Sequence, residues 1–108
     1  MEQIKKLIEA AAKTECTGIV ESHGLFHTLH EAYGVCLEEY EEAREEMDAC
    51  EECIKEAWKA TREDDQQTAF AAYMKAYQRA KNAAAECTQI AAVCLKLLKG
   101  LDERKLMG

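Results

Sequence analysis

The sequence predicts an all-α protein, and three observations lead to this prediction. The chain of 108 residues has no proline and only 5 glycines, so few positions break or end a helix. Alanine, glutamate, lysine, leucine and glutamine dominate, and all of them favour helices. Two long stretches then repeat apolar residues at alternating three- and four-residue steps, the period of an amphipathic helix. We therefore expect one domain over residues 1–108, with helices at about 2–22, 29–62 and 65–99.

The first expected helix covers residues 2–22 and presents an apolar face that includes Ile4, Leu7 and Ile8. Gly24 follows it, and glycine is common just after a helix C-terminus. Thr28 and Glu31 then form the capping-box pattern, which predicts where the second helix begins.

The second and third helices carry the two longest apolar alternations. In the second helix these positions are Tyr33, Cys36, Tyr40, Ala43, Met47, Cys50, Ile54, Ala57 and Thr61. In the third they are Phe70, Tyr73, Tyr77, Ala80, Ala84, Cys87, Ala91, Cys94 and Leu98, and Gly100 is expected to end the helix. The segment 62–65 predicts a turn, with Asp64 or Asp65 capping the third helix. A connection this short makes the two helices an antiparallel hairpin.

One hairpin and one shorter N-terminal helix bury little apolar surface for a chain of this length. Alanine and cysteine on the alternating positions allow helix backbones to approach closely, as they do in bundles. We therefore expect a homodimer or higher homo-oligomer, in which paired hairpins form a four-helix-bundle core.

Composition excludes several kinds of partner. The formal net charge of −7 argues against binding a nucleic-acid polymer, which requires a basic face. No apolar run approaches the ~20 residues that span a bilayer, and the first residues lack a signal-peptide pattern. The 6 cysteines lie within helical patterns, so we expect free, mostly buried thiols in a cytoplasmic protein. Cys50 and Cys53 have a redox or zinc spacing, but their place inside an acidic helix favours a structural role.

Carboxylates form the main candidate site. Glu39 and Glu42 lie one turn apart on one helix, and Glu86 and Gln89 repeat this spacing on the next. Glu42 and Glu86 are each about 22 residues from the turn at Asp64, so an antiparallel hairpin brings them to the same height. Hard cations such as Mg²⁺ or Mn²⁺ prefer oxygen ligands of this kind. The alternative is an acidic helix face that is simply solvated.

The residues around these carboxylates carry a resemblance to a known family. The chain reads His-Glu-Ala-Tyr-Gly-Val over 30–35, Glu-Glu-x-x-Glu over 38–42, and Glu-x-x-Gln-Ile-Ala-Ala over 86–92. It thereby resembles the all-α nucleoside triphosphate pyrophosphohydrolases of the MazG-like group, and most of all short MazG-like proteins of bacteria and prophages. The resemblance covers about residues 20–98.

The resemblance implies a helical bundle, usually dimeric, that cleaves an NTP or dNTP to NMP and pyrophosphate with Mg²⁺. It implies metal ligands at Glu39, Glu42, Glu86 and Gln89, with Glu38 beside Glu39 at the catalytic position. The well-studied enzymes have aspartate where this chain has Gln89. An amide oxygen can ligate Mg²⁺ but brings no charge, so weaker metal binding is expected here.

Other side chains have both a functional and a structural interpretation. Lys75 and Arg79 would meet a triphosphate, or else form ordinary ion pairs on a solvated face. His30 would hydrogen-bond Glu86 or a phosphate; with two other histidines, at 23 and 27, it would otherwise cap helices rather than bind zinc. Three aromatic residues are expected in the core rather than as base-stacking platforms: Tyr33, Trp58 and Tyr77.

Three functions remain open at this point. The first is the Mg²⁺-dependent pyrophosphohydrolase, acting on a nucleoside triphosphate. The second is a catalytically weak MazG-like helical module, of bacterial or phage origin, that binds a nucleotide or a protein partner, and Gln89 favours it. The third is a purely structural helical dimer.

Overall fold

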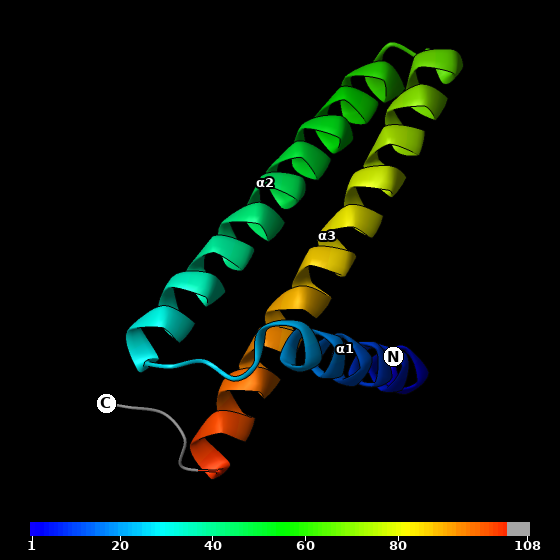
Figure 1. Cartoon of the computed structure of the whole chain (residues 1–108). Coiled ribbons are helices and arrows are strands. Elements are labelled where there is room, and N and C mark those ends of the chain that lie inside the picture. The colour runs from blue at the N-terminus through cyan, green and yellow to red at the C-terminus, as the bar shows by residue number, and fades with distance from the viewer. Residues whose placement is uncertain (104–108) are drawn as a thin grey trace. The chain divides into compact units, whose positions relative to one another are not determined.

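The computed structural model describes residues 1–103, and three helices account for nearly all of them (Figure 1). Helix α1 spans Glu2–His23, α2 spans Leu29–Arg62 and α3 spans Gln66–Asp102. No strand occurs within residues 1–103. The all-α prediction is therefore confirmed, and each predicted helix lies within a few residues of its observed place.

The helix ends follow local side-chain chemistry. Gly24 adopts a φ of 73°, and its N–H donates to the carbonyl of Val20 at 2.8 Å. At the start of α2, the backbone N–H of Glu31 donates to the Thr28 hydroxyl at 3.0 Å. At the start of α3, the N–H of Thr68 donates to the Asp65 carboxylate at 3.1 Å, which makes Asp65 the cap.

The predicted end of α3 at Gly100 is wrong. Gly100 is buried inside the helix, which continues to Asp102. A glycine inside a helix costs roughly 1 kcal/mol relative to alanine. Val93 and Lys96 are buried in the preceding turns, so this part of the helix packs against other residues of unit 1, defined below.

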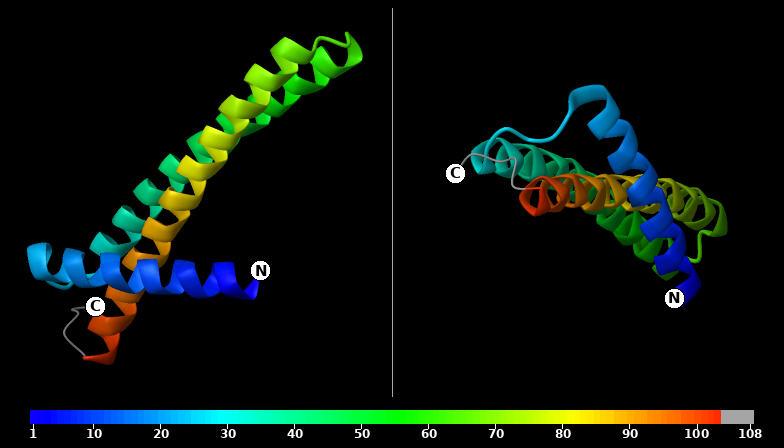
Figure 2. Two further views of the ribbon diagram at one scale, coloured as in Figure 1. Left: turned by 90° about the vertical axis from the view of Figure 1, so that its right-hand side faces the viewer. Right: turned by 60° about the horizontal axis from the view of Figure 1, so that its bottom comes forward.

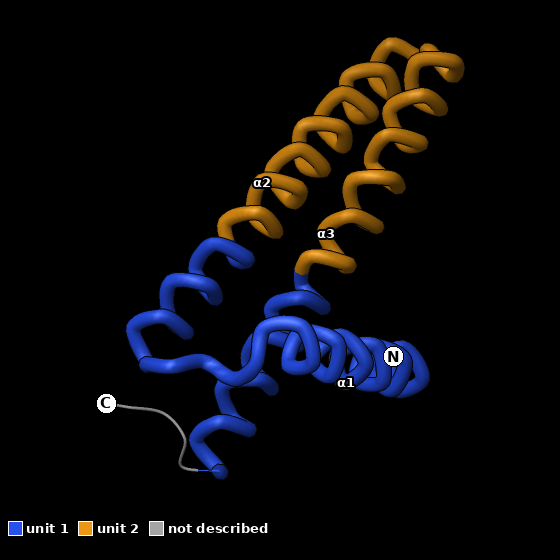
Figure 3. Tube along the Cα trace, viewed as in Figure 1, with its two compact units in different colours: residues 1–40, 87–108 blue, residues 41–86 orange. Residues whose placement is uncertain are grey.

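The chain divides into two compact units (Figure 3). Unit 1 contains Met1–Tyr40 together with the chain from Cys87 onward, and unit 2 contains Glu41–Glu86. Helices α2 and α3 each contribute a segment to both units.

Unit 2 is an antiparallel hairpin of α2 and α3, whose helices run side by side (Figures 1 and 2). Small side chains form its seam. Cys50, Cys53 and Ala76 make one buried cluster, and the Cys50 thiol donates to the carbonyl of Ala76 at 3.6 Å. The other buried residues of this unit are Ala43, Ala57, Ala60, Ala72 and Ala83. Small residues allow close helix approach, as the sequence predicted for this pair.

The face of α3 that is buried in unit 2 is offset by one residue from the apolar face that the sequence predicts. The structure buries Ala72, Ala76 and Ala83, whereas Phe70 is 71 % exposed and Tyr77 is 58 % exposed. In α2, the prediction holds for three of its small members and fails for its large ones. Ala43, Cys50 and Ala57 are buried there, but Tyr33, Tyr40, Met47 and Ile54 are exposed.

The expectation that Tyr33, Trp58 and Tyr77 belong to the core is therefore wrong for the single chain. Trp58 keeps 59 % of its surface exposed. For Trp58 and Tyr77, which belong to unit 2, the physical reason is size, because a two-helix seam closes on alanine and cysteine and leaves bulky side chains outside.

Unit 1 contains larger core side chains. Phe26, in the connection before α2, is only 3 % exposed and packs with Ala32 and Val93. Val35, Cys36 and Leu97 pack against this cluster. Helix α1 crosses the C-terminal segment of α3 in this unit (Figure 2) and buries Ala12 and Cys16.

Within residues 1–103 the longest helices are too polar to serve as membrane spans, so the structure offers no bilayer-crossing segment there.

Candidate metal centre and cavity

Three carboxylates come together as the sequence spacing predicts. Glu39, Glu42 and Glu86 each offer an oxygen, and these oxygens lie within 4.8 Å of one another. Glu39 and Glu42 lie one turn apart on the continuous helix α2, and Glu42 and Glu86 both belong to unit 2. Glu39 and Glu86 are half-buried, and Glu42 is exposed.

This group has the donor chemistry of a site for a hard divalent cation. Mg²⁺ binds carboxylate oxygens at about 2.1 Å in octahedral geometry, which separates opposite ligand oxygens by roughly 4.2 Å. Adjacent ligands of such an ion are only about 3.0 Å apart. The three glutamate oxygens lie within 4.8 Å of one another, so they would have to move closer together to bind one cation. Three carboxylates also repel one another, and a bound cation removes that repulsion.

The other two predicted residues near this group differ in exposure. Gln89 lies one turn after Glu86 on α3, is half-buried, and lines a cavity of unit 1 together with Glu39. Glu38 is exposed on α2. The amide of Gln89 and the carboxylate of Glu39 thus share one wall.

The predicted phosphate-binding cations of unit 2 have other surroundings. Arg79 donates to the Glu46 carboxylate at 3.2 Å, and Asn82 donates to the same carboxylate at 3.4 Å. Lys75 is exposed. Arg79 therefore takes part in an ion pair between α2 and α3 within this unit.

The histidines lie on or beside exposed helix ends. His27 contacts the Glu31 carboxylate at 3.3 Å, and this contact takes the place of the return bond expected from a capping box. His30 is exposed in the first turn of α2, and His23 is the last residue of α1.

Unit 1 contains a partly open cavity of about 410 Å³, and its walls include residues that the sequence patterns did not single out. All three helices and the connection before α2 contribute. The lining residues are Ile19, His23, Phe26, Glu31, Val35, Glu39, Gln89, Val93 and Lys96.

Lys96 is the most unusual of these residues. It is only 6 % exposed, and its Nζ lies 4.1 Å from the centre of the Phe26 ring. The sequence places Lys96 within an apolar stretch, three residues after Val93, but no pattern there indicates that it is buried.

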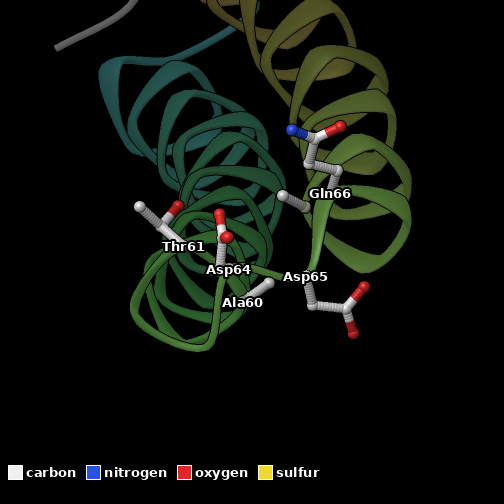
Figure 4. A pocket seen from close by; sticks show the side chains of 6 residues that line it. Ala60, Thr61, Asp64, Asp65 and Gln66 are labelled. Carbon is white, nitrogen blue, oxygen red and sulfur yellow. The ribbon is translucent and has the colours of Figure 1, made fainter.

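A smaller hollow of about 150 Å³ lies at the hairpin turn of unit 2 and includes Thr61 and Asp64 (Figure 4). The carboxylate of Asp65 points away from Asp64 (Figure 4) and accepts hydrogen bonds from the hydroxyl and the N–H of Thr68. This turn therefore uses Asp65 to cap α3.

All six cysteines are free thiols. Cys16, Cys50 and Cys53 are buried, whereas Cys87 and Cys94 are exposed, so the expectation of mostly buried cysteines holds for only part of the set. Burial raises the pKa of the Cys36 thiol, and the neighbouring Cys94 raises this pKa further.

Comparisons with known proteins return no family: no family model, no curated protein and no solved structure matches this chain.

Proposed function

We propose that this protein is a Mg²⁺-dependent nucleoside triphosphate pyrophosphohydrolase that releases NMP and pyrophosphate in the cytoplasm. One observation supports the proposal above all others. Glu86 lies more than 40 residues from Glu39 and Glu42 along the chain, yet the three residues bring carboxylate oxygens within 4.8 Å of one another. The motif resemblance predicts these same residues as metal ligands.

In this proposal the three glutamates hold the cation, and Gln89 adds a neutral oxygen one turn beyond Glu86. A bound Mg²⁺ supplies charge neutralisation of phosphate oxygens and a more acidic water. Glu38 is exposed next to Glu39 on α2, so its carboxylate is accessible to take a proton from an attacking water.

A weakly catalytic nucleotide-binding module is the second candidate function, and Gln89 favours it. The amide leaves the site with three carboxylates, so the metal is held with one negative charge fewer than four acids would provide. Product analysis separates the two functions, since a binding module retains nucleotide without releasing pyrophosphate.

The metal proposal is tested by thermal unfolding with and without Mn²⁺, followed by pyrophosphate release from a panel of NTPs and dNTPs. Mn²⁺ at a hundred times its dissociation constant should stabilise the fold by about 2.7 kcal/mol. Glu42→Gln should abolish this gain, while Glu41→Gln, an exposed neighbour, should keep it. An identical Mn²⁺ response in Glu42→Gln and the wild type would contradict the proposal.

We also propose that the chain forms a homodimer through the outer face of unit 2. Large apolar side chains are exposed there on both helices: Met47, Ile54, Trp58, Phe70, Tyr73 and Tyr77. Large apolar side chains exposed in such number are a typical feature of an interface. A second hairpin packed on this face would complete a four-helix core.

Light scattering at micromolar concentration tests the dimer. The wild type should have twice the mass of the chain, and Trp58→Glu should be monomeric because it places a charge within the apolar face. Gln67→Glu adds the same charge at another exposed position and should remain dimeric. A monomeric wild type would refute the proposed interface.

A further inference from the structure

Lys96 is a buried cation of unit 1. Its side chain lines the cavity, and only 6 % of the residue is exposed. Lysine is almost never buried to this degree without a partner, because its ammonium loses the solvation of water.

The partner observed for Lys96 is an aromatic ring and no carboxylate. Its Nζ lies 4.1 Å from the centre of the Phe26 ring, which offers the cation its negative face. Among residues 1–103, no ion pair within 4.0 Å involves Lys96. A ring only partly replaces water, so the ammonium keeps the capacity to donate hydrogen bonds to an anion.

The acidic side chains of the same cavity restrict the kind of anion. Glu31 and Glu39 line the cavity together with Lys96, so its lining contains two carboxylates and one ammonium. A bare anion would meet net negative charge there. A phosphate chain that arrives with a divalent cation satisfies both signs, with its oxygens on Lys96 and its metal on the side of Glu39.

The apolar residues that line the cavity further favour a metal-bound phosphate chain. Ile19, Val35 and Val93 lower the local dielectric constant, and charge-assisted hydrogen bonds are stronger in such surroundings. A volume of about 410 Å³ accommodates a phosphate chain with its metal and waters.

We propose that the cavity of unit 1 binds the metal-bound phosphate chain of a nucleotide and that Lys96 is the cation that contacts its oxygens. The proposal rests on the pyrophosphohydrolase function and replaces Lys75 and Arg79 as the main phosphate contacts. Arg79 is engaged by Glu46, and Lys75 is exposed, whereas Lys96 shares a wall with Glu39 and Gln89.

Calorimetric titration with pyrophosphate in saturating Mg²⁺ tests this assignment on the full chain. Lys96→Met keeps the length of the side chain and removes its charge, so pyrophosphate affinity should fall about tenfold or more. Lys96→Arg should recover part of the affinity. Lys99→Met, an exposed change on the same helix, should stay within about twofold of the wild type. Equal affinity in Lys96→Met and the wild type would overturn the assignment.

A parallel Mn²⁺ thermal shift separates this inference from the function on which it rests. Lys96→Met should keep the Mn²⁺ response of the wild type, since Lys96 is no metal ligand. A wild type that responds to Mn²⁺ but binds pyrophosphate independently of Lys96 refutes only the role of Lys96. A wild type without an Mn²⁺ response refutes the metal site, even if pyrophosphate binding depends on Lys96.

Orthophosphate distinguishes a nucleotide tail from free phosphate. Pyrophosphate should bind more tightly than orthophosphate, because a chain reaches both the ammonium and the metal. Orthophosphate binding as tightly as pyrophosphate would overturn the nucleotide assignment.

A measurement on the unaltered protein removes any dependence on the folding of a variant. The side-chain end of Lys96 lies over the Phe26 ring, so the ring current should give its ε-methylene group an unusual NMR shift in ¹³C-lysine-labelled protein. Pyrophosphate with Mg²⁺ should move this resonance. A resonance that stays in place at saturating pyrophosphate would contradict the contact.

Discussion

In unit 2, the half-buried carboxylate of Glu46 accepts hydrogen bonds from Arg79 at 3.2 Å and from Asn82 at 3.4 Å. In unit 1, the buried ammonium of Lys96 lies against the ring of Phe26 and lines a cavity. The first charge is balanced by side chains of the neighbouring helix, whereas the second has an aromatic partner and adjoining space. A charge that is paired within the protein, like that of Glu46, stabilises the fold. A buried charge beside open space, like that of Lys96, is suited to binding a ligand.

The side chains that pack each unit explain this difference. Unit 2 closes on alanine and cysteine, so its helices approach closely and charged groups at the seam must pair with each other. Unit 1 packs Phe26, Val35 and Val93 among segments of all three helices, and these larger side chains leave about 410 Å³ between them. Helix α1 supplies Ile19 and His23 to that wall, which a hairpin alone would lack.

Overpacking the small-residue seam of unit 2 should have the largest effect on stability. Ala83 is 2 % exposed in this unit, so Ala83→Leu should lower the free energy of unfolding by about 1–3 kcal/mol. Ala84 is exposed on the same turn, and Ala84→Leu should change this free energy by less than about 0.5 kcal/mol. Denaturant unfolding measures both. A larger loss in Ala84→Leu than in Ala83→Leu would place the seam one residue later.

Adding a carboxylate beside Glu39 should make the stability of unit 1 depend more strongly on bound metal. Gln89→Asp introduces a carboxylate in the wall that Glu39 lines, and Mn²⁺ affinity should rise about tenfold, or roughly 1.4 kcal/mol. Without metal, the added repulsion should make the variant less stable than the wild type. Gln66→Asp, at the hairpin turn, should leave Mn²⁺ affinity unchanged. An equal rise in Mn²⁺ affinity in both variants would show that the effect does not depend on a carboxylate at position 89.

Much of the fold could be predicted because it depends on short-range chemistry. Gly24, Thr28 and Asp65 mark helix ends through their own backbone or side-chain preferences, and each lies where the sequence predicts it. The burial of α3 could not be predicted in the same way. Phe70 and Tyr77 dominate its apolar pattern, yet the hairpin buries Ala72 and Ala76, because backbone distance and not side-chain hydrophobicity decides which face closes.

The candidate site likewise has one part that the sequence predicts and another that it does not. The approach of Glu42 and Glu86 follows from their equal distances to the turn, which a sequence displays directly. The cavity could not be predicted, since it depends on where α1 and Phe26 lie against α3 in unit 1. In the sequence, Lys96 is an ordinary charge within an apolar stretch, and only the fold of unit 1 places it in that wall.

Breaking the charge pair of unit 2 should have a smaller effect than overpacking its seam or adding a carboxylate at position 89. Arg79→Met removes the guanidinium and leaves the half-buried Glu46 with Asn82, so stability should fall by about 0.5–1 kcal/mol. Arg44 pairs with Asp48 at 3.9 Å on an open surface, and Arg44→Met should cost about 0.2 kcal/mol or less. A double-mutant cycle with Glu46→Gln isolates the pair. A zero coupling energy in that cycle would show that Glu46 and Arg79 do not stabilise each other.

The smallest expected effect concerns Asp65, whose charge is satisfied by neither a side-chain cation nor a ligand. The Thr68 hydroxyl and its backbone N–H hold the pKa of Asp65 below its usual value. A lowered pKa in the folded state means that Asp65 stabilises the fold above its unfolded pKa of about 3.9, and this contribution is lost as pH falls through the folded pKa. The melting temperature of Asp65→Asn should therefore lie below that of the wild type at pH 7, and the difference should shrink as the pH falls below about 4. Thr68→Val removes the main cause of the shift, so the pH dependence attributable to Asp65 should be weaker in that background. A wild-type advantage over Asp65→Asn that stays constant from about pH 7 to about pH 2 would assign the role of Asp65 to its shape and not to its charge.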